Sequence, residues 1–142
     1  MRKMIIAAIA LPLSFLANQA SAETISCVLE NNKVVTVSNL GTKPVYSYGT
    51  AGKVELTLPS KSASSRVYKG AEAFSGGGST YIAFTNGAYT YALYNGTGRG
   101  WEFVGLRVYK GADTIMEKSC KNYDSLNLSF DAINAPEDDL PY

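Results

Sequence analysis

Short apolar stretches alternate with polar positions along most of this chain, and glycine, asparagine, proline or serine interrupts them roughly every eight to twelve residues. Alternation with a period of two is typical of strands that bury one face, and regular turn signals are typical of a sheet protein. Beyond residue 22 no stretch has the 3.6-residue apolar period of a helix. The pattern predicts strands at residues 24–30, 33–38, 44–48, 53–58, 66–69, 80–85, 88–95, 101–109 and 114–119.

Three tight turns are predicted between these strands. Asn31-Asn32 closes the first hairpin, because asparagine tolerates a positive φ. Asn86-Gly87 stands between two tyrosine-rich strands and predicts a two-residue type I′ turn. Residues 110–113, Lys-Gly-Ala-Asp, close a further hairpin, so residues 80–119 are expected to form a four-stranded meander.

Composition agrees with a sheet protein, since the chain has ten tyrosines and thirteen glycines. An antiparallel sheet of about eight strands must fold onto itself or close in order to protect its edges. We therefore expect one all-β domain at residues 23–130, a small antiparallel β-barrel or sandwich of about eight strands. Residues 131–142 are acidic and contain Pro136 and Pro141, which predicts a flexible tail.

The first 22 residues differ from the rest of the chain. Arg2 and Lys3 precede an apolar run from Met4 to Ala17, and Ala20-Ser21-Ala22 follows. This order is typical of a signal peptide. Because the run is shorter than the roughly 20 residues that span a bilayer, we expect cleavage before Glu23 and no membrane insertion afterwards. The expected location is the periplasm or the outside of the cell.

Export would bring Cys27 and Cys120, the two cysteines of the chain, into an oxidising compartment. We therefore predict a disulfide between them. It would close a loop of over 90 residues. In the chain-entropy description such a loop stabilises a fold by about 4 to 5 kcal/mol.

Charge and missing residue types exclude several functions. Without Arg2 and Lys3 the positive residues fall from 13 to 11 against 12 negative ones, so no basic surface recruits nucleic acid. The chain has no histidine, which excludes Ser-His-Asp and Cys-His catalysis and histidine-bearing zinc sites. Glu55, Glu72 and Glu102 leave carboxylate chemistry open, but alternation puts them on solvent-exposed strand positions. We expect no enzyme, no metal and no cofactor.

Two glycine-rich segments, residues 75–80 and 95–100, are the candidate binding surface. A turn at Asn86-Gly87 would pair Tyr81 with Ala92 and Ser79 with Tyr94, which brings both segments to one end of the hairpin. Arg99 lies between two glycines, so its guanidinium should project into solvent, where it can bind carboxylates through two hydrogen bonds. The candidate partner-binding residues are Ser75, Gly77, Ser79, Tyr94, Arg99 and Trp101.

The segment from Ser75 to Tyr81, Ser-Gly-Gly-Gly-Ser-Thr-Tyr, is followed by Tyr-Ala-Leu-Tyr-Asn-Gly at residues 91–96. Together with a cysteine near each end of the domain, these segments resemble the periplasmic and membrane-bound inhibitors of C-type lysozyme, over about residues 70–120. The resemblance implies an eight-stranded antiparallel barrel that inserts a loop serine and a lysine into the lysozyme cleft, against the catalytic carboxylates. Ser75 or Ser79 matches that serine. Asn95 stands in place of the lysine, and Arg99 is the nearest substitute.

These observations predict an exported, non-catalytic protein that inhibits a cell-wall hydrolase resembling C-type lysozyme. Arg99 would pair with the hydrolase carboxylates, Ser75 and Ser79 would donate hydrogen bonds, and Tyr94 and Trp101 would form the buried aromatic anchor. One alternative is a periplasmic module that stacks Trp101, Tyr89 and Tyr91 on the sugar rings of glycans or peptidoglycan fragments. Another is an immunity protein against a secreted toxin.

Overall fold

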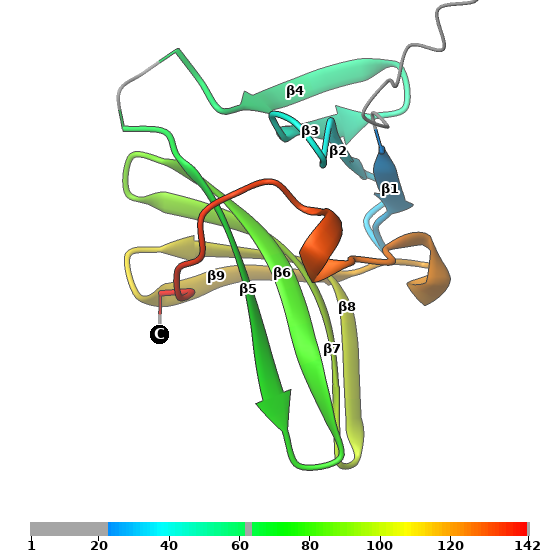
Figure 1. The fold of residues 1–142 in the computed structure, drawn as a ribbon. Coiled ribbons are helices and arrows are strands. Elements are labelled where there is room, and N and C mark those ends of the chain that lie inside the picture. The colour runs from blue at the N-terminus through cyan, green and yellow to red at the C-terminus, as the bar shows by residue number, and fades with distance from the viewer. Residues whose placement is uncertain (1–22, 62–63, 142) are drawn as a thin grey trace, which may run out of the picture.

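The computed structural model describes residues 23–61 and 64–141, so the predicted signal peptide at residues 1–22 lies outside the described residues (Figure 1). The described residues form two antiparallel sheets, with strand orders β1-β2-β3-β4 and β5-β6-β7-β8-β9. In each sheet, strands that follow one another in sequence pair with one another. The all-β prediction is confirmed. Within the described chain an isolated antiparallel bridge between Leu29 and Cys120 joins the two sheets at one edge, but the sheets do not close into a barrel.

Every predicted strand overlaps an observed one. The strands of the first sheet are β1 (Ile25–Val28), β2 (Val34–Ser38), β3 (Val45–Thr50) and β4 (Lys53–Leu58). Those of the second sheet are β5 (Val67–Phe74), β6 (Gly77–Asn86), β7 (Tyr89–Gly98), β8 (Trp101–Lys110) and β9 (Asp113–Ser119). Two single-turn 3-10 helices follow, η1 (Tyr123–Ser125) and η2 (Phe130–Ala132).

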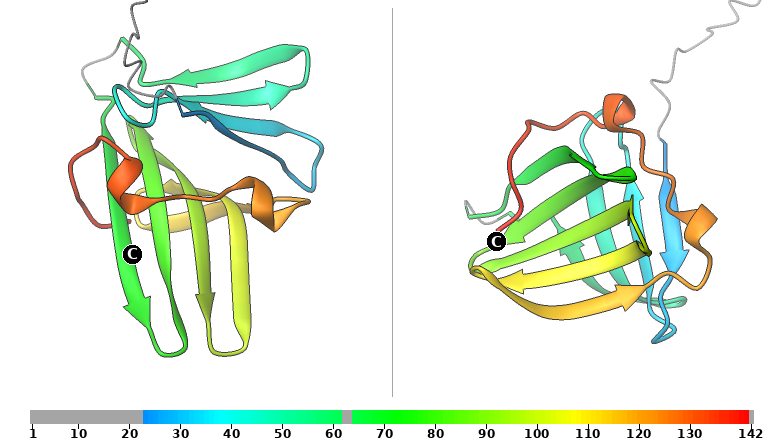
Figure 2. Two further views of the ribbon diagram at one scale, coloured as in Figure 1. Left: turned by 45° about the vertical axis from the view of Figure 1, so that its right-hand side comes forward. Right: turned by 90° about the horizontal axis from the view of Figure 1, so that it is seen from below.

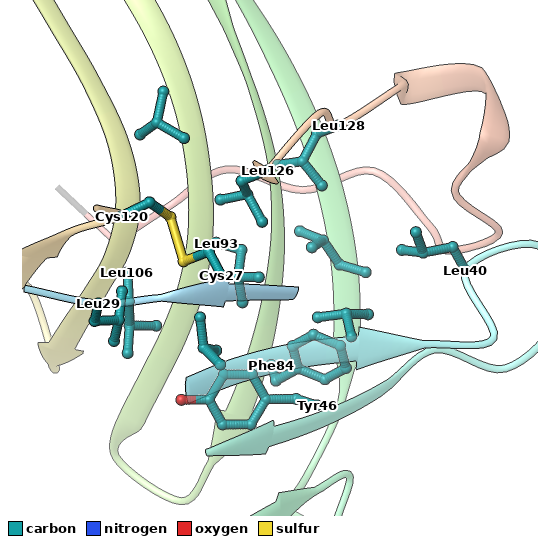
Figure 3. Close-up of a cluster of buried hydrophobic side chains, with 14 of the residues drawn as sticks. Cys27, Leu29, Leu40, Tyr46, Phe84, Leu93, Leu106, Cys120, Leu126 and Leu128 are labelled. Carbon is teal, nitrogen blue, oxygen red and sulfur yellow. A yellow bond between two sulfur atoms is a disulfide. The ribbon is translucent and has the colours of Figure 1, made fainter. Parts of the chain in front are cut away.

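The main core lies between the two sheets (Figure 3). Alternating positions of β2, β3, β6, β7 and β8 supply most of its side chains, and Leu126, Leu128 and Ile133 from the C-terminal segment complete it. The predicted disulfide is confirmed. Cys27 in β1 and Cys120 after β9 are bonded across this core, with their Cα atoms 5.7 Å apart. The disulfide therefore fastens the beginning of the first sheet to the end of the second.

A second, smaller cluster covers the opposite face of the second sheet. Neighbouring residues of a strand point to opposite faces, so Ile82 belongs to the main core while Tyr81 belongs to this cluster. We call it the outer cluster. Its members are Tyr68, Tyr81, Ala83, Ala92, Tyr94, Tyr109 and Leu140, with Phe103 packed against them.

The C-terminal segment is docked on the second sheet, which differs from the prediction of a flexible tail at residues 131–142. The Lys69 N–H in β5 donates to the Pro136 carbonyl at 2.9 Å, and the Asp138 N–H donates to the Lys69 carbonyl at 3.1 Å. The Tyr81 hydroxyl donates to the Asp138 carbonyl at 2.7 Å. Leu140 is only 3% exposed. An acidic, proline-containing composition concealed this apolar residue and the unpaired backbone groups that edge strand β5 offers.

The β6–β7 hairpin corrects the predicted turn. The chain turns at Gly87-Ala88, one residue later than predicted, so Tyr81 faces Tyr94 instead of Ala92. Gly87 has a φ of 61° and Ala88 has no positive φ, which is typical of a type II′ turn, not type I′. Both registers leave each side chain on the same face of the sheet. Alternation of apolar residues therefore could not distinguish them.

The other two predicted turns are confirmed. Asn32 adopts a φ of 65° between β1 and β2. Lys110 pairs with Asp113 across the β8–β9 turn, where Gly111 has a φ of 58°. The predicted meander at residues 80–119 is therefore present, and β5 extends it to five strands.

Candidate functional site

The second sheet reaches beyond the first at one end, where the β5–β6 and β7–β8 hairpins project side by side (Figures 1 and 2). β6, β7 and β8 have ten residues each, whereas the longest strand of the first sheet has six. The extra length is what carries the two turns clear of the first sheet. We call residues 74–77 and 98–101 the hairpin tips.

The two hairpin tips touch. Their turns are Ser75-Gly76 and Arg99-Gly100, and the Arg99 N–H donates to the Ser75 carbonyl at 3.2 Å. Gly76 and Gly100 take φ values of 81° and 80°, a conformation that favours glycine. The prediction that the two glycine-rich segments meet is thus confirmed. Residues 77–80 and 95–98, however, belong to strands and not to loops.

Four of the six predicted binding residues are exposed at the hairpin tips: Ser75, Gly77, Arg99 and Trp101. Trp101 is 42% exposed. Within the described part of the chain the Arg99 side chain takes part in no ion pair, since the three ion pairs are Lys33–Glu55, Arg66–Asp138 and Arg107–Glu117. The Arg99 guanidinium is therefore available to an external carboxylate.

The other two predicted residues, Ser79 and Tyr94, are buried in the sheet. Ser79 is 6% exposed and Tyr94 is 3% exposed. Ser79 lies on the same face as Tyr81 because β6 begins at Gly77, and it faces Gly96 across the ladder. Its hydroxyl has no hydrogen-bond partner among the described residues. The predicted role of Ser79 and Tyr94 in contacting a partner is therefore corrected, because both side chains are buried on the face of the sheet that carries the outer cluster.

Phe74 is a residue of the hairpin tips that sequence reasoning missed. Its ring packs edge-on against Trp101, with 5.6 Å between ring centroids. The Trp101 indole lies across Gly98, where a Cβ atom would collide with it. Phe74 and Trp101 thus form an aromatic pair beside Arg99. The strand before the first glycine-rich segment was predicted to end at residue 69, whereas β5 runs on to Phe74. The available signal was an apolar aromatic residue directly before that segment.

Below the tips, a cationic side chain joins two aromatic rings. The Arg107 guanidinium lies 4.2 Å from the ring centroid of Tyr94 and 4.6 Å from that of Phe103. Its Nε donates to Glu117 at 3.0 Å. Cation–π contacts and an ion pair from one residue connect β7, β8 and β9. The hairpin tips therefore extend from a packed base.

Asn95, at the position where the resemblance expects a lysine, has a structural role. Its side-chain amide donates to the Leu126 carbonyl at 2.7 Å and so fastens β7 to the C-terminal segment. Asn95 also borders a polar cavity of about 300 Å³, which contains the carboxylates of Glu102 and Asp124. Within the described residues no group of three or more histidine, cysteine, aspartate or glutamate side chains could hold a metal ion.

The rings predicted to stack on sugars do not form one surface. Tyr91 packs against the main core, on the opposite face of the sheet from Trp101. Tyr89 lies at the far end of β7, next to the β6–β7 turn. The prediction that Trp101, Tyr89 and Tyr91 stack together on sugar rings is therefore corrected. The strand register places these rings on both faces of the second sheet and at opposite ends of its strands.

Comparisons with known proteins give no relative of this chain. No protein-family model, no curated protein and no solved structure matches it. Among the described residues no helix is long and apolar enough to cross a membrane.

Proposed function

We propose that this protein is an exported, non-catalytic inhibitor of a cell-wall hydrolase resembling C-type lysozyme, and that its hairpin tips enter the active-site cleft of that enzyme. The observation that carries the proposal is the contact between the two hairpin tips. It presents Arg99, which forms no ion pair with any described residue, next to an exposed tryptophan. The predicted signal peptide would bring the protein to the periplasm, where such hydrolases act.

Charge supports this target. Glycosidases of the lysozyme type hold two carboxylates on either side of the bond that they cleave. A guanidinium that enters such a cleft can form a bidentate hydrogen-bonded pair with a carboxylate. Arg99 suits this role because it is the first residue of the exposed two-residue turn Arg99-Gly100. Ser75, exposed on the neighbouring tip, is the serine that can add a hydrogen bond.

The shape and rigidity of the hairpin tips also support the proposed insertion into an active-site cleft. Two adjacent turns of two residues make a narrow projection, and the strands behind them fix its backbone before binding. A preorganised binding surface loses less conformational entropy on association than a flexible loop does. Trp101 with Phe74 supplies the kind of aromatic anchor that dominates the binding energy of many interfaces.

The architecture marks where the resemblance to lysozyme inhibitors stops. The resemblance implies an eight-stranded antiparallel barrel, whereas this chain forms a four-stranded and a five-stranded sheet over its described residues, which do not close into a barrel. Asn95 is also held by Leu126 and carries no charge. The class of target is therefore inferred from the resemblance, and the contact residues are inferred from the hairpin tips.

The test is inhibition of purified C-type, G-type and I-type lysozymes by protein comprising residues 23–142. We expect strong inhibition of the C-type enzyme. Arg99→Ala should weaken binding by about 2 to 5 kcal/mol, because it leaves buried enzyme carboxylates without their partner. The matched control is Lys53→Ala, which removes one positive charge from an exposed position of β4, in the other sheet.

Two results would reject the proposal. One is a lack of inhibition of every lysozyme class by the unmodified protein. The other is an equal loss of inhibition in Arg99→Ala and Lys53→Ala, which would assign the effect to net charge and not to the hairpin tips.

Trp101 also favours a second candidate function, the binding of glycan fragments, because its indole rests on Gly98 and remains 42% exposed. An exposed aromatic ring next to a polar tip can stack on a sugar. The chain has one tryptophan, so its fluorescence reports directly on that site. A saturable fluorescence change with chitooligosaccharides, in the absence of lysozyme inhibition, would favour glycan binding over the inhibitor.

A further inference from the structure

Edge strand β5 offers a second interaction surface, separate from the hairpin tips. The N–H and C=O groups of Lys69 point away from β6, because both are bonded to the C-terminal segment, at Pro136 and Asp138. Backbone groups in an antiparallel ladder alternate between the two sides of a strand, so those of Ala71 and Ala73 point the same way as those of Lys69. Among the described residues nothing pairs with these outward groups of Ala71 and Ala73. We call residues 71–73 the free edge.

The free edge lacks most of the features that protect an exposed strand. Edge strands are commonly shielded by charged side chains, proline, a bulge or a covering segment. Ala71 and Ala73 are small and exposed, and the β5–β6 ladder has no register shift. Glu72 projects from the other face of the strand. In Figure 1 and in the left view of Figure 2, β5 runs on toward the hairpin tips beyond the point where the C-terminal segment leaves it.

The chain itself shows what kind of molecule this edge binds. Residues 136–138 lie beside β5, and Glu137 forms a parallel β-bridge with Lys69. Their two backbone hydrogen bonds to Lys69 measure 2.9 Å and 3.1 Å. The segment then passes to the outer face, where Leu140 is buried. A polypeptide segment paired through its backbone thus already occupies the part of β5 that precedes the free edge.

An acidic cavity adjoins the free edge at the point where the C-terminal segment leaves β5. Its volume is about 290 Å³, and it is bordered by Ala71 and by the carboxylates of Glu137, Asp138 and Asp139. Asp138 is paired with Arg66 at 2.7 Å. Glu137 and Asp139 form no ion pair with any described residue. Two carboxylates at the end of the free edge are therefore available to a positive charge.

Lys69 also lines this cavity, but it does not neutralise these two carboxylates. Its ammonium group donates to the Phe130 carbonyl at 2.8 Å and lies 4.0 Å from the centroid of the Phe130 ring. The positive charge of Lys69 is thus held against η2. The charge of the cavity therefore favours a basic side chain from outside.

We propose that the free edge binds an extended segment of a partner protein, which adds a sixth strand to the second sheet and places a lysine or arginine side chain in the acidic cavity. The backbone of the segment bonds to the outward groups of Ala71 and Ala73, and its basic side chain pairs with Glu137 and Asp139. In this mode of recognition the backbone supplies affinity and the side chain supplies specificity. The inference does not rest on the proposed inhibition of a hydrolase.

The test uses the synthetic peptide acetyl-Thr-Val-Thr-Val-Arg-amide, whose arginine reaches the cavity when the peptide pairs antiparallel to β5. One matched peptide has glutamate in place of arginine, and another is N-methylated at every internal amide. Binding is followed by the backbone amide NMR signals of Ala71 and Ala73. We expect saturable shifts with the arginine peptide, roughly 3-fold weaker binding of the glutamate peptide, and no saturable binding of the N-methylated peptide.

Variants separate the backbone contact from the charge contact. Ala73→Pro removes one outward N–H, and proline is tolerated on an edge strand where its nitrogen faces away from the sheet. We expect this variant to bind the arginine peptide about 3- to 10-fold more weakly. Glu137→Gln should reduce the preference for arginine over glutamate. The matched control Asp131→Asn removes an exposed carboxylate of η2 that does not line the cavity, and it should leave that preference unchanged.

Four results would overturn the inference. Three are a lack of saturable shifts at Ala71 and Ala73, equal binding of the N-methylated and unmethylated peptides, and equal changes of preference in Glu137→Gln and Asp131→Asn. The fourth is a concentration-dependent dimer that Ala73→Pro abolishes, because a second copy of this chain would then occupy the edge. If Ala73→Pro does not fold, the N-methylated peptide and Glu137→Gln still decide. None of these measurements involves a lysozyme, so the free edge and the hairpin tips are tested separately.

Discussion

The two faces of the second sheet are built in different ways. The inner face is rich in aliphatic side chains, the first sheet covers it, and the disulfide crosses it. The outer face consists largely of tyrosines, and among the described residues the C-terminal segment is what packs over it, through Leu140. The comparison teaches that one face of this sheet supplies the main core, while the other is a single layer of aromatic rings that needs no second sheet.

Glycines make the single layer possible. Tyr81 lies across Gly70, Tyr94 across Gly96 and Trp101 across Gly98, and a Cβ atom at any of these glycines would collide with the ring. Glycine in a strand often marks such a close approach. The rings therefore lie against the backbone of the sheet, both in the outer cluster and, for Trp101, at the hairpin tips.

The largest expected effect on stability comes from the disulfide, which crosses the core on the inner face. Replacing Cys27 and Cys120 together by serine should lower the free energy of unfolding by about 4 to 5 kcal/mol, because the 93-residue separation makes loop closure in the unfolded chain costly. Urea denaturation measures this difference. An unchanged midpoint would mean that the inner face is held by side-chain packing alone.

The outer face should depend on the C-terminal segment. Leu140→Ala should cost about 2 to 3 kcal/mol, near the low end for a buried leucine, because the residue lies at the edge of its cluster. Ile115→Ala is the control, since Ile115 is 53% exposed and its truncation should change stability by less than about 0.5 kcal/mol. Equal effects of the two substitutions would mean that the segment does not stabilise the outer face.

Among the described residues two buried hydroxyls lack a partner, Tyr46 in the main core and Ser79 on the face of the outer cluster. Tyr46→Phe and Ser79→Ala should each raise the free energy of unfolding by about 1 kcal/mol, because each removes an unpaired polar group. Tyr81→Phe is the opposite case. Its hydroxyl donates to the Asp138 carbonyl, so its loss should lower stability by about 1 kcal/mol. Thermal unfolding of the three variants distinguishes the two signs.

Alkaline pH should also weaken the outer face. Burial raises the pKa of Tyr81 to about 12, from an ordinary value of 10. A group whose pKa is higher in the folded state stabilises the fold fully below its unfolded pKa, and this contribution is lost as the pH rises from about 10 to about 12. Stability should therefore fall between about pH 10 and pH 12, and less so in Tyr81→Phe. Equal slopes in both proteins would contradict this assignment.

The strands could be predicted because alternation is a local signal. The register of β6 and β7 could not, since moving each pair by two residues keeps Tyr81 and Ile82 on their faces. What decides between the registers is the neighbour that each side chain meets. In the observed register Ile82 pairs with Leu93, and Tyr81 stacks on Tyr94 with 6.4 Å between ring centroids.

Some features of the candidate site could be predicted from the sequence and others could not. Topology brought the two glycine-rich segments together, and the isolated position of Arg99 between glycines indicated its exposure. The burial of Ser79 and Tyr94 was missed. The glycines near them were interpreted as a sign of loops, whereas in the structure they belong to strands and allow aromatic rings to lie on the backbone. The docking of Leu140 was missed because its neighbours in sequence are acidic, while the edge strand that receives it is far away in sequence.

The Cys27–Cys120 bond has a consequence for the biogenesis of the protein. A chain with two cysteines has one possible intrachain pairing, so an oxidant is sufficient and an isomerase that reshuffles wrong pairs is not required. Synthesis from the N-terminus produces Cys27 long before Cys120. During that interval the thiol of Cys27 has no correct partner within its own chain, and its main chemical risk is capture by the thiol of another molecule.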